Sequence, residues 1–284
     1  MGFEYLEPRT IEEAVALLSR HNGKAKVIAG GTDLMNQVRL KAIKPEYLVD
    51  IGRIPGLDDI RYDEKGRLSI GARTPIRAIE RSPEILKNHP VIAQAAGALG
   101  SMAIRNVGTV GGNLCNAAPS ADTAPALIGL GASVKIFGPE GKREVFLEDF
   151  FTGSGTTILR RGELLAEIRV PPMSRGMKGV YLKHSIKGTA DLAVVGVAAI
   201  ATPEGNQCKD MNIILGAVAP TPMRARKSEA AIKGREIDSS LIDAVARMAA
   251  EESRPIRDVR ASAEYRKEMV KVFTGYALKS VLGR

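Results

Sequence analysis

The chain has 284 residues, enough for about two domains, and its composition of 44% hydrophobic and 26% charged residues excludes a mainly disordered protein. No apolar run approaches the roughly 20 residues that a transmembrane helix needs. The first residues lack the basic and apolar segments of a secretory signal, so we expect a cytoplasmic protein. Two cysteines and three scattered histidines are too few for an iron–sulfur cluster or a thiol-rich zinc site, so we expect no metal bound by this chain. The absence of Trp and the 4% aromatic content disfavour a base-stacking nucleic-acid surface.

The charge is positive and unevenly distributed. The chain has 41 Lys and Arg against 32 Asp and Glu, a formal net charge of +9. Residues 222–284 alone hold 14 basic and 9 acidic residues, a net charge of +5. This excess is consistent with a solvated basic helical face, or with a surface that meets an acidic partner.

The N-terminal part of the chain alternates helix and strand signals. Thr10 and Glu13 have the spacing of a capping box and precede an amphipathic helix. Residues 26–29 and 47–51 predict short strands, and residues 32–40 between them predict a helix. This strand–helix–strand order predicts a small parallel sheet.

The middle of the chain mixes helical, turn-rich and strand-like segments. Thr74-Pro75 is typical of a helix start with Pro at the first helical position, and residues 84–100 predict one helix rich in Ala and Leu. Residues 105–118 are dense in turn signals. Strands are predicted near 132–138, 143–147 and 163–170.

After Pro171-Pro172 the pattern changes, so we predict domains over 1–172 and 173–284. The second region has three strand-like runs followed by three helical segments, which indicates an α+β domain with an antiparallel meander. The predicted strands cover 178–186, 192–201 and 209–218, and the predicted helices lie near 227–234, 239–252 and 261–281.

Two glycine loops carry the chemical information, one over residues 29–34 and one over residues 108–114. Adjacent glycines leave backbone N–H groups uncovered and let phosphates approach closely. Thr32, Thr109 and Asn113 can add hydrogen bonds to phosphate oxygens. Either loop alone is more typical of a tight turn, but the pair suits a diphosphate held from both sides.

Other nucleotide motifs are absent. Gly153-Ser154-Gly155 lacks the third glycine of G-x-G-x-x-G, and no G-x-x-x-x-G-K-[ST] is present, which disfavours a Rossmann NAD site and a P-loop. Asp122 is consistent with a hydrogen-bond acceptor for a ribose diol or with a cap on the helix that starts near Thr123. We interpret the Asp33 side chain as a helix cap, because a carboxylate facing phosphates would repel them.

The two loops, in this order, resemble those of the FAD-binding medium subunit of molybdenum hydroxylases, the xanthine dehydrogenase and carbon monoxide dehydrogenase family. The resemblance covers essentially the whole chain. It includes the segments 29–34, 109–114 with Ala118-Pro119 and Asp122, 163–171, 181–183, 191–193 and 216–224.

The resemblance implies an α+β chain with a vanillyl-alcohol-oxidase-type (PCMH-like) FAD-binding domain. This domain would have two α/β subdomains, about 1–56 and 57–172, and a C-terminal α+β domain with a three-stranded antiparallel sheet would follow over 173–284. It also implies the cofactor-binding residues. The adenosine-diphosphate part of FAD would lie against Val27, Ile28, Ala29, Gly30, Gly31 and Thr32, with Asp33 and Leu34 completing the loop, and its pyrophosphate against Thr109, Gly112 and Asn113.

The same resemblance implies that Asp122 lies at the adenosine ribose or its neighbourhood, and Leu165 and Lys183 beside the isoalloxazine ring. A cation there would stabilise the anionic reduced flavin. Without the resemblance, Lys183 reads as an exposed strand lysine.

The implied function is that of an FAD-binding electron-transfer subunit, with no catalytic residue of its own. A large subunit would carry the molybdenum cofactor, and a small subunit would pass electrons from [2Fe-2S] clusters through FAD to NAD, a quinone or another acceptor. The implied assembly is a heterotrimer or a dimer of heterotrimers. The alternatives are a non-enzymatic scaffold subunit that binds acidic partners through its basic C-terminal helices, and a self-contained flavin oxidase. The oxidase is disfavoured because neither a substrate domain nor a histidine suited to covalent flavin attachment is evident.

Overall fold

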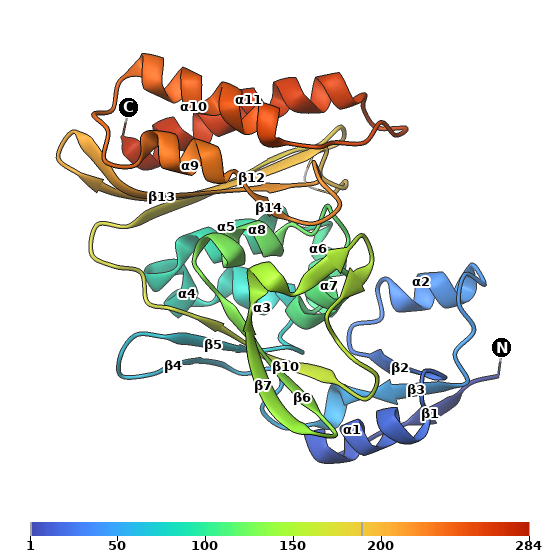
Figure 1. Cartoon of the computed structure of the whole chain (residues 1–284). Coiled ribbons are helices and arrows are strands. Elements are labelled where there is room, and N and C mark those ends of the chain that lie inside the picture. The colour runs from blue at the N-terminus through green and yellow to red at the C-terminus, as the bar shows by residue number, and fades with distance from the viewer. Residues whose placement is uncertain (1, 189, 284) are drawn as a thin grey trace.

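The computed structural model describes residues 2–188 and 190–283. Three regions follow one another in space as they do in the sequence (Figure 1). The N-terminal strands and helices, in blue, lie at one end, and the C-terminal sheet and helices, in yellow to red, lie at the other. Within the described residues, no helix is both long and apolar enough to cross a bilayer.

The N-terminal region is a small parallel sheet, as predicted, with β3 between β1 and β2. The capping box is confirmed, because Thr10 Oγ1 accepts a hydrogen bond from the N–H of Glu13, and the Glu13 carboxylate accepts one from the N–H of Arg9. The elements are β1 (Glu4–Leu6), α1 (Ile11–Arg20), β2 (Ala25–Ile28), α2 (Leu34–Arg39) and β3 (Tyr47–Asp50). The strand β1 was not predicted.

The middle region combines six helices with a five-stranded antiparallel sheet of order β4-β5-β10-β6-β7. Its strands are β4 (Ile60–Tyr62), β5 (Leu68–Gly71), β6 (Ser133–Gly138), β7 (Gly141–Phe146) and β10 (Leu164–Val170), and a separate hairpin joins β8 (Phe151–Gly153) to β9 (Thr156–Thr157). Its helices are α3 (Ile76–Arg81), α4 (Pro83–Asn88), α5 (Pro90–Ala98), α6 (Met102–Val107), α7 (Val110–Asn116) and α8 (Thr123–Gly129).

Three predictions for this region are wrong. The single helix over 84–100 is two helices, α4 and α5, because Pro90 removes a backbone donor at the junction. The segment 105–118, predicted as turns, lies mostly in α6 and α7, whose first turns are capped by Ser101 and Thr109. Pro75 precedes α3 in extended backbone, because this segment pairs with the loop at Thr109.

The C-terminal region is an antiparallel sheet that lies between its own helices and helices of the middle region. Its strands are β11 (Lys178–His184), β12 (Val195–Glu204), β13 (Gln207–Gly216) and the short β14 (Met223–Arg224), which extends the predicted three-stranded meander to four. Its helices are α9 (Arg226–Ile232), α10 (Ser239–Glu252) and α11 (Ala263–Leu282).

Alternate residues of β12 enter different cores. Val197 and Ala199 pack with the C-terminal helices, whereas Ala198 and Ile200 join the core of the middle region. Both faces of this strand are buried, which explains its continuous apolar sequence. The helices α5 and α8 cover the face opposite α9 and α11.

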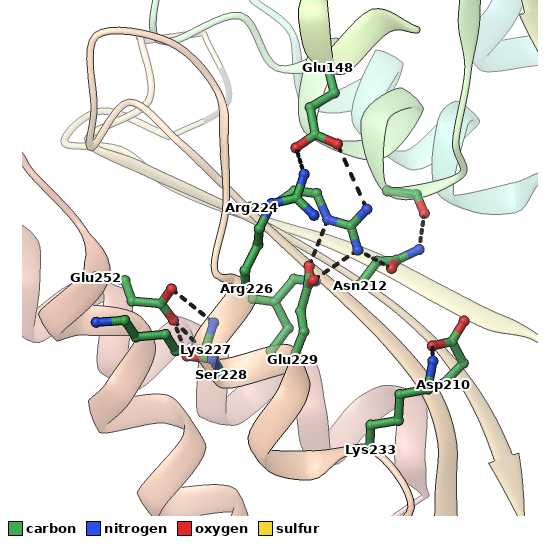
Figure 2. A network of polar contacts seen from close by, with 12 residues as sticks. Glu148, Asp210, Asn212, Arg224, Arg226, Lys227, Ser228, Glu229, Lys233 and Glu252 are labelled. Carbon is green, nitrogen blue, oxygen red and sulfur yellow. Dashed lines mark hydrogen bonds and ion pairs between the residues drawn. The ribbon is translucent and has the colours of Figure 1, made fainter.

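Polar contacts also join the middle and C-terminal regions (Figure 2). Glu148 forms ion pairs with Arg224 and Arg226, and Asn212 Nδ2 donates to the carbonyl oxygen of Gly129 at 2.7 Å. Each region nevertheless has its own hydrophobic cluster. We therefore retain 1–172 and 173–284 as a proposed division of the chain.

Candidate functional site

The two glycine loops contact each other and line one cavity of about 620 Å³. A Cβ atom built on Gly30 would lie 2.1 Å from the carbonyl oxygen of Val107, directly before the second loop. Only glycine allows this approach. The volume is within the range of small-molecule and cofactor sites.

The first loop presents a row of backbone N–H groups. The carbonyl oxygens of Gly31, Thr32 and Asp33 accept hydrogen bonds from Met35 N, Asn36 Nδ2 and Gln37 N at 2.9, 2.7 and 3.0 Å. The N–H groups of the same three residues have no hydrogen-bond partner among the residues that the structure describes. Successive unpaired N–H groups in a loop form a concave anion site.

The Asp33 side chain does not cap α2, so that prediction is wrong. Asp33 precedes the helix but has helical backbone angles, φ −95° and ψ −47°, and its carboxylate makes no capping hydrogen bond. A capping side chain normally folds back from an extended residue. The backbone N–H of Asp33 remains one of the unpaired donors.

The second loop forms the first turn of α7, so its glycine N–H groups are not uncovered as predicted. Gly112 N donates to Thr109 Oγ1 at 3.1 Å, and Gly111 N donates to the carbonyl oxygen of Ala72 at 2.8 Å. A Cβ atom on Gly111 would lie 2.6 Å from Ala72, so this glycine permits close packing. The glycine N–H groups of this loop are therefore already hydrogen-bonded within the protein.

Two side chains of the second loop keep donors available. Thr109 Oγ1 accepts the Gly112 hydrogen bond, which leaves its own hydrogen to donate. Asn113 Oδ1 accepts a hydrogen bond of 2.6 Å from Thr123 Oγ1. Its Nδ2 group has no partner within the described part of the chain.

The cavity brings together all but three of the predicted site residues. Ile28, Asp122 and Lys183 are not part of its lining, although Ile28 supports the loop at Gly31. The predicted residues that do line it are Val27, Ala29, Gly30, Gly31, Thr32, Asp33, Leu34, Thr109, Gly112, Asn113 and Leu165.

Asp122 and Lys183 form a buried ion pair behind the cavity wall. Lys183 Nζ lies 2.9 Å from Asp122 Oδ2 and donates to the carbonyl oxygen of Ala98 at 2.8 Å, and the Tyr181 hydroxyl donates to Asp122 Oδ1 at 2.7 Å. Burial raises the pKa of the Asp122 carboxyl, against the opposing effects of Lys183 and of the Tyr181 hydrogen bond. Ala98 precedes Leu99, which lines the cavity.

This pair corrects two interpretations. The Lys183 side chain is only 5% exposed, so it is not an exposed strand lysine. Asp122 makes no capping hydrogen bond to α8. The expected place of Asp122 at the adenosine ribose or its neighbourhood stays a prediction.

Sequence reasoning missed several residues of the cavity wall. Glu163 is neutralised by Arg143, with two hydrogen bonds of 2.8 Å that lower the pKa of the Glu163 carboxyl. Gly155 stands in an incomplete glycine motif, Gly153-Ser154-Gly155, which gives no signal for a site. The apolar wall residues carry no sequence signal that separates them from core residues. Gly108 and Gly111 line the cavity as members of the predicted second loop. The other wall residues not predicted are Lys26, Gln37, Ile43, Ile51, Ala72, Ile76, Leu99, Ile104, Cys115, Asn116, Leu159 and Leu164.

The Cys115 thiol in the cavity wall is not activated as a nucleophile. Burial raises the pKa of the Cys115 thiol to about 12, so it stays protonated near neutral pH. Cys115 and Cys208 are both free thiols. Within residues 2–188 and 190–283, no group of three or more His, Cys, Asp or Glu side chains could hold a metal ion.

Family models match nearly the whole chain. Residues 1–173 match the FAD binding domain in molybdopterin dehydrogenase, and residues 181–281 match the CO dehydrogenase flavoprotein C-terminal domain. The chain belongs to the family of FAD-binding medium subunits of carbon monoxide and xanthine dehydrogenases. This medium subunit is therefore part of an FAD-dependent oxidoreductase.

Named relatives align over almost their full length. The carbon monoxide dehydrogenase medium chain of Hydrogenophaga pseudoflava is 34% identical, over 99% of this chain and 98% of that one. The putative xanthine dehydrogenase FAD-binding subunit of Escherichia coli is 30% identical, over 95% and 92%.

The fold agrees with solved structures of such enzymes. A chain of the carbon monoxide dehydrogenase of Hydrogenophaga pseudoflava that lacks the Mo-pyranopterin moiety of its cofactor matches with a TM-score of 0.97 and 34% identity, covering 100% of this chain and 98% of that one. A chain of quinoline 2-oxidoreductase from Pseudomonas putida matches with a TM-score of 0.94 and 27% identity, over 100% and 98%. The expected PCMH-like FAD-binding domain with a C-terminal α+β domain is thus confirmed.

The residues of the cavity fit FAD. The unpaired N–H groups of the first loop match the negative charge of a diphosphate, and neutral donors stand on the second loop. Two carboxylates line the cavity, those of Asp33 and Glu163. The charge of Glu163 is neutralised by its ion pair with Arg143.

Proposed function

We propose that this medium subunit carries electrons from [2Fe-2S] clusters of a small partner subunit, through FAD, to NAD, a quinone or another acceptor. When bound, FAD supplies a ring that takes up and releases electrons singly or in pairs. The chain's own residues bind and orient that cofactor. The observation that carries the proposal is that both glycine loops line one cavity and that one of them leaves three N–H groups unpaired.

The diphosphate is the part of FAD that these residues are best suited to hold. The N–H groups of Gly31, Thr32 and Asp33 act from one side, and Thr109 Oγ1 and Asn113 Nδ2 act from the other. Hydrogen bonds to a charged group contribute about 1.5–3 kcal/mol each, so these five donors support firm binding without a cationic side chain.

We assign Asp122 to the flavin end of FAD, together with Lys183 and Leu165, rather than to the adenosine ribose. The support is the 2.9 Å ion pair and its link through Ala98 to the wall at Leu99. In this position Lys183 offers positive charge near the reduced ring, and Asp122 and Tyr181 hold the lysine in place. The electrostatic stabilisation of the reduced ring by Lys183 is smaller than that by an isolated lysine, because the negative charge of Asp122 offsets part of the lysine's positive charge.

We further propose that a large subunit carries the molybdenum cofactor and selects the substrate. Medium chains of similar identity to this one are named for carbon monoxide dehydrogenase and for glyceraldehyde dehydrogenase, at 34% and 33%. Such varied names support a medium subunit that does not recognise the substrate. The assembly would be a cytoplasmic heterotrimer or a dimer of heterotrimers.

The decisive experiment is to purify the full chain alone and together with its molybdenum and iron–sulfur subunits. The chain should be yellow and release FAD, and its flavin should be reduced when substrate is added to the complex. A colourless chain that refuses added FAD contradicts the binding site. A flavin that stays oxidised in an intact, substrate-reduced complex contradicts the electron route.

A further inference from the structure

The segment between α10 and α11 exposes two apolar side chains among arginines. Val259 is 99% exposed and Ile256 is 69% exposed. Arg254, Arg257 and Arg260 alternate with them at every third position. This segment, residues 253–262, reaches beyond the ends of the helices that it joins (Figure 1). We call it the arginine loop.

The arginine loop is held in one conformation by Asp258. The Asp258 carboxylate accepts hydrogen bonds from Arg260 N and Arg260 Nη1, at 2.8 and 2.9 Å, and from Arg266 Nη2 at 2.8 Å. Desolvation opposes ionisation of Asp258, but these hydrogen bonds outweigh it and lower its pKa to about 2. The carboxylate therefore stays charged at neutral pH.

Arg266 anchors this arrangement in the protein interior. Its side chain is buried, and Nη1 donates to the carbonyl oxygens of Val194 and Ala217 at 2.7 and 3.2 Å. At the other end of the loop, Arg254 N donates to the carbonyl oxygen of Val218 at 2.8 Å. Ile256 and Val259 are thus displayed by an ordered segment, and an ordered segment loses less entropy on binding than a flexible one.

We infer that the arginine loop docks onto an acidic subunit of the same complex, with Val259 and Ile256 entering an apolar hollow rimmed by carboxylates. This inference rests on the proposed function for the existence of such a subunit. Asp258 pairs with both Arg260 and the buried Arg266, so the exposed Arg254 and Arg257 set the outward charge. The rim charges speed and orient the encounter, and the apolar tip excludes water at the centre.

Two other partners of the arginine loop, a second copy of this chain and a nucleic acid, fit its side chains less well. A second copy of this chain carries the same net charge of +9 and the same loop, so two copies repel each other. A nucleic acid would satisfy the arginines but would leave the side chains of Val259 and Ile256 without an apolar surface to contact.

The test compares assembly of the full FAD-loaded chain with its molybdenum and iron–sulfur subunits, for the unaltered chain and for Val259→Asp. Val259 touches little of its own protein, so the variant should keep its flavin content and its unfolding midpoint. We expect the subunit dissociation constant to rise at least about tenfold. Arg257→Glu should slow association, most strongly at low salt, and Arg257→Lys should largely restore the rate. Phe146→Asp, at a 66% exposed position on β7, is the matched control and should assemble normally.

Each other outcome contradicts the inference. If Val259→Asp assembles as tightly as the unaltered chain, the arginine loop is not the docking surface, whereas the proposed function stands. If the unaltered chain holds FAD but assembles with neither subunit, the proposed function fails and the docking inference fails with it. If Arg257→Glu loses binding only to heparin, the loop is a polyanion site instead.

Discussion

Gly30 packs against the backbone of Val107 so closely that a side-chain carbon at residue 30 would lie 2.1 Å from the Val107 carbonyl oxygen. This contact joins the N-terminal sheet to the end of α6. The two loops therefore meet through protein atoms, and the shape of the cavity depends on the absence of a single methyl group.

We expect Gly30→Ala to force the two loops apart. Because the nearest atom belongs to the backbone and cannot rotate away, overpacking of this kind should lower the free energy of unfolding by about 1–3 kcal/mol. FAD content should fall together with stability. Chemical denaturation and flavin absorbance of the purified variant check both effects.

The matched control is Gly97→Ala in α5. The nearest atom to a Cβ at Gly97 is Glu80 Cγ at 3.6 Å, which is an ordinary contact. Alanine should stabilise that helix by up to about 1 kcal/mol and leave FAD content unchanged. Equal losses in both variants would show that the Gly30 contact has no special role.

Thr109→Ala removes two functions of one hydroxyl. It deletes the cap on α7, which should cost about 1 kcal/mol of stability, and it deletes a proposed phosphate donor. We expect FAD affinity to fall about tenfold or more, because a hydrogen bond to a charged group is lost. Fluorescence titration with FAD measures the change, and Thr109→Ser should restore both properties.

Lys183→Met should destabilise the protein by about 3–5 kcal/mol, because it leaves a buried carboxylate without its cation. Burial already raises the pKa of Asp122, and loss of Lys183 removes an influence that lowers it. An acid whose pKa is raised in the folded state stabilises that state at low pH and loses this stabilisation as the pH rises. The variant should therefore be less stable at pH 8 than at pH 5.

The double variant Lys183→Met/Asp122→Asn separates this effect from simple loss of packing. It lacks both the Asp122 carboxyl and the Lys183 amine, so titration of Asp122 can no longer change its stability between pH 5 and pH 8. A pH dependence that survives in the double variant means that the variation arises elsewhere.

The Asp258 pair gives the opposite dependence on pH. The pKa of Asp258 is about 2 in the folded protein and about 3.9 in an unfolded chain. Its charge therefore stabilises the folded protein above about pH 4, and this contribution disappears as the pH falls towards 2. Asp258→Asn should lower the melting temperature at neutral pH, and the difference should shrink between pH 4 and pH 2. A constant difference across this range would contradict the assignment.

Much of the fold was predictable because local signals agreed with tertiary packing. The capping box at Thr10 and the three successive strand-like runs of the C-terminal sheet are examples. The failures lie where packing overrode local preference. The turn-like residues of α7 fold as a helix because Gly111 packs against Ala72 and Thr109 caps the first turn.

The site was predicted in part for the same reason. Glycine pairs are visible in a sequence, and both loops line the cavity. That Gly112 N is already bonded to Thr109, and that Asp122 pairs with Lys183, depend on the folded chain. Residues 61 positions apart leave no sequence signal that they share an ion pair.

The N-terminal sheet has its own small core, which it extends mainly onto Leu164 and Ala166 of β10, and it meets the second loop at Gly30. The cavity is lined by both the N-terminal region and the second loop, so a cofactor bound there would contact both. We therefore expect FAD binding and the packing of the N-terminal region to be thermodynamically linked, so that a substitution that weakens this packing also lowers FAD affinity.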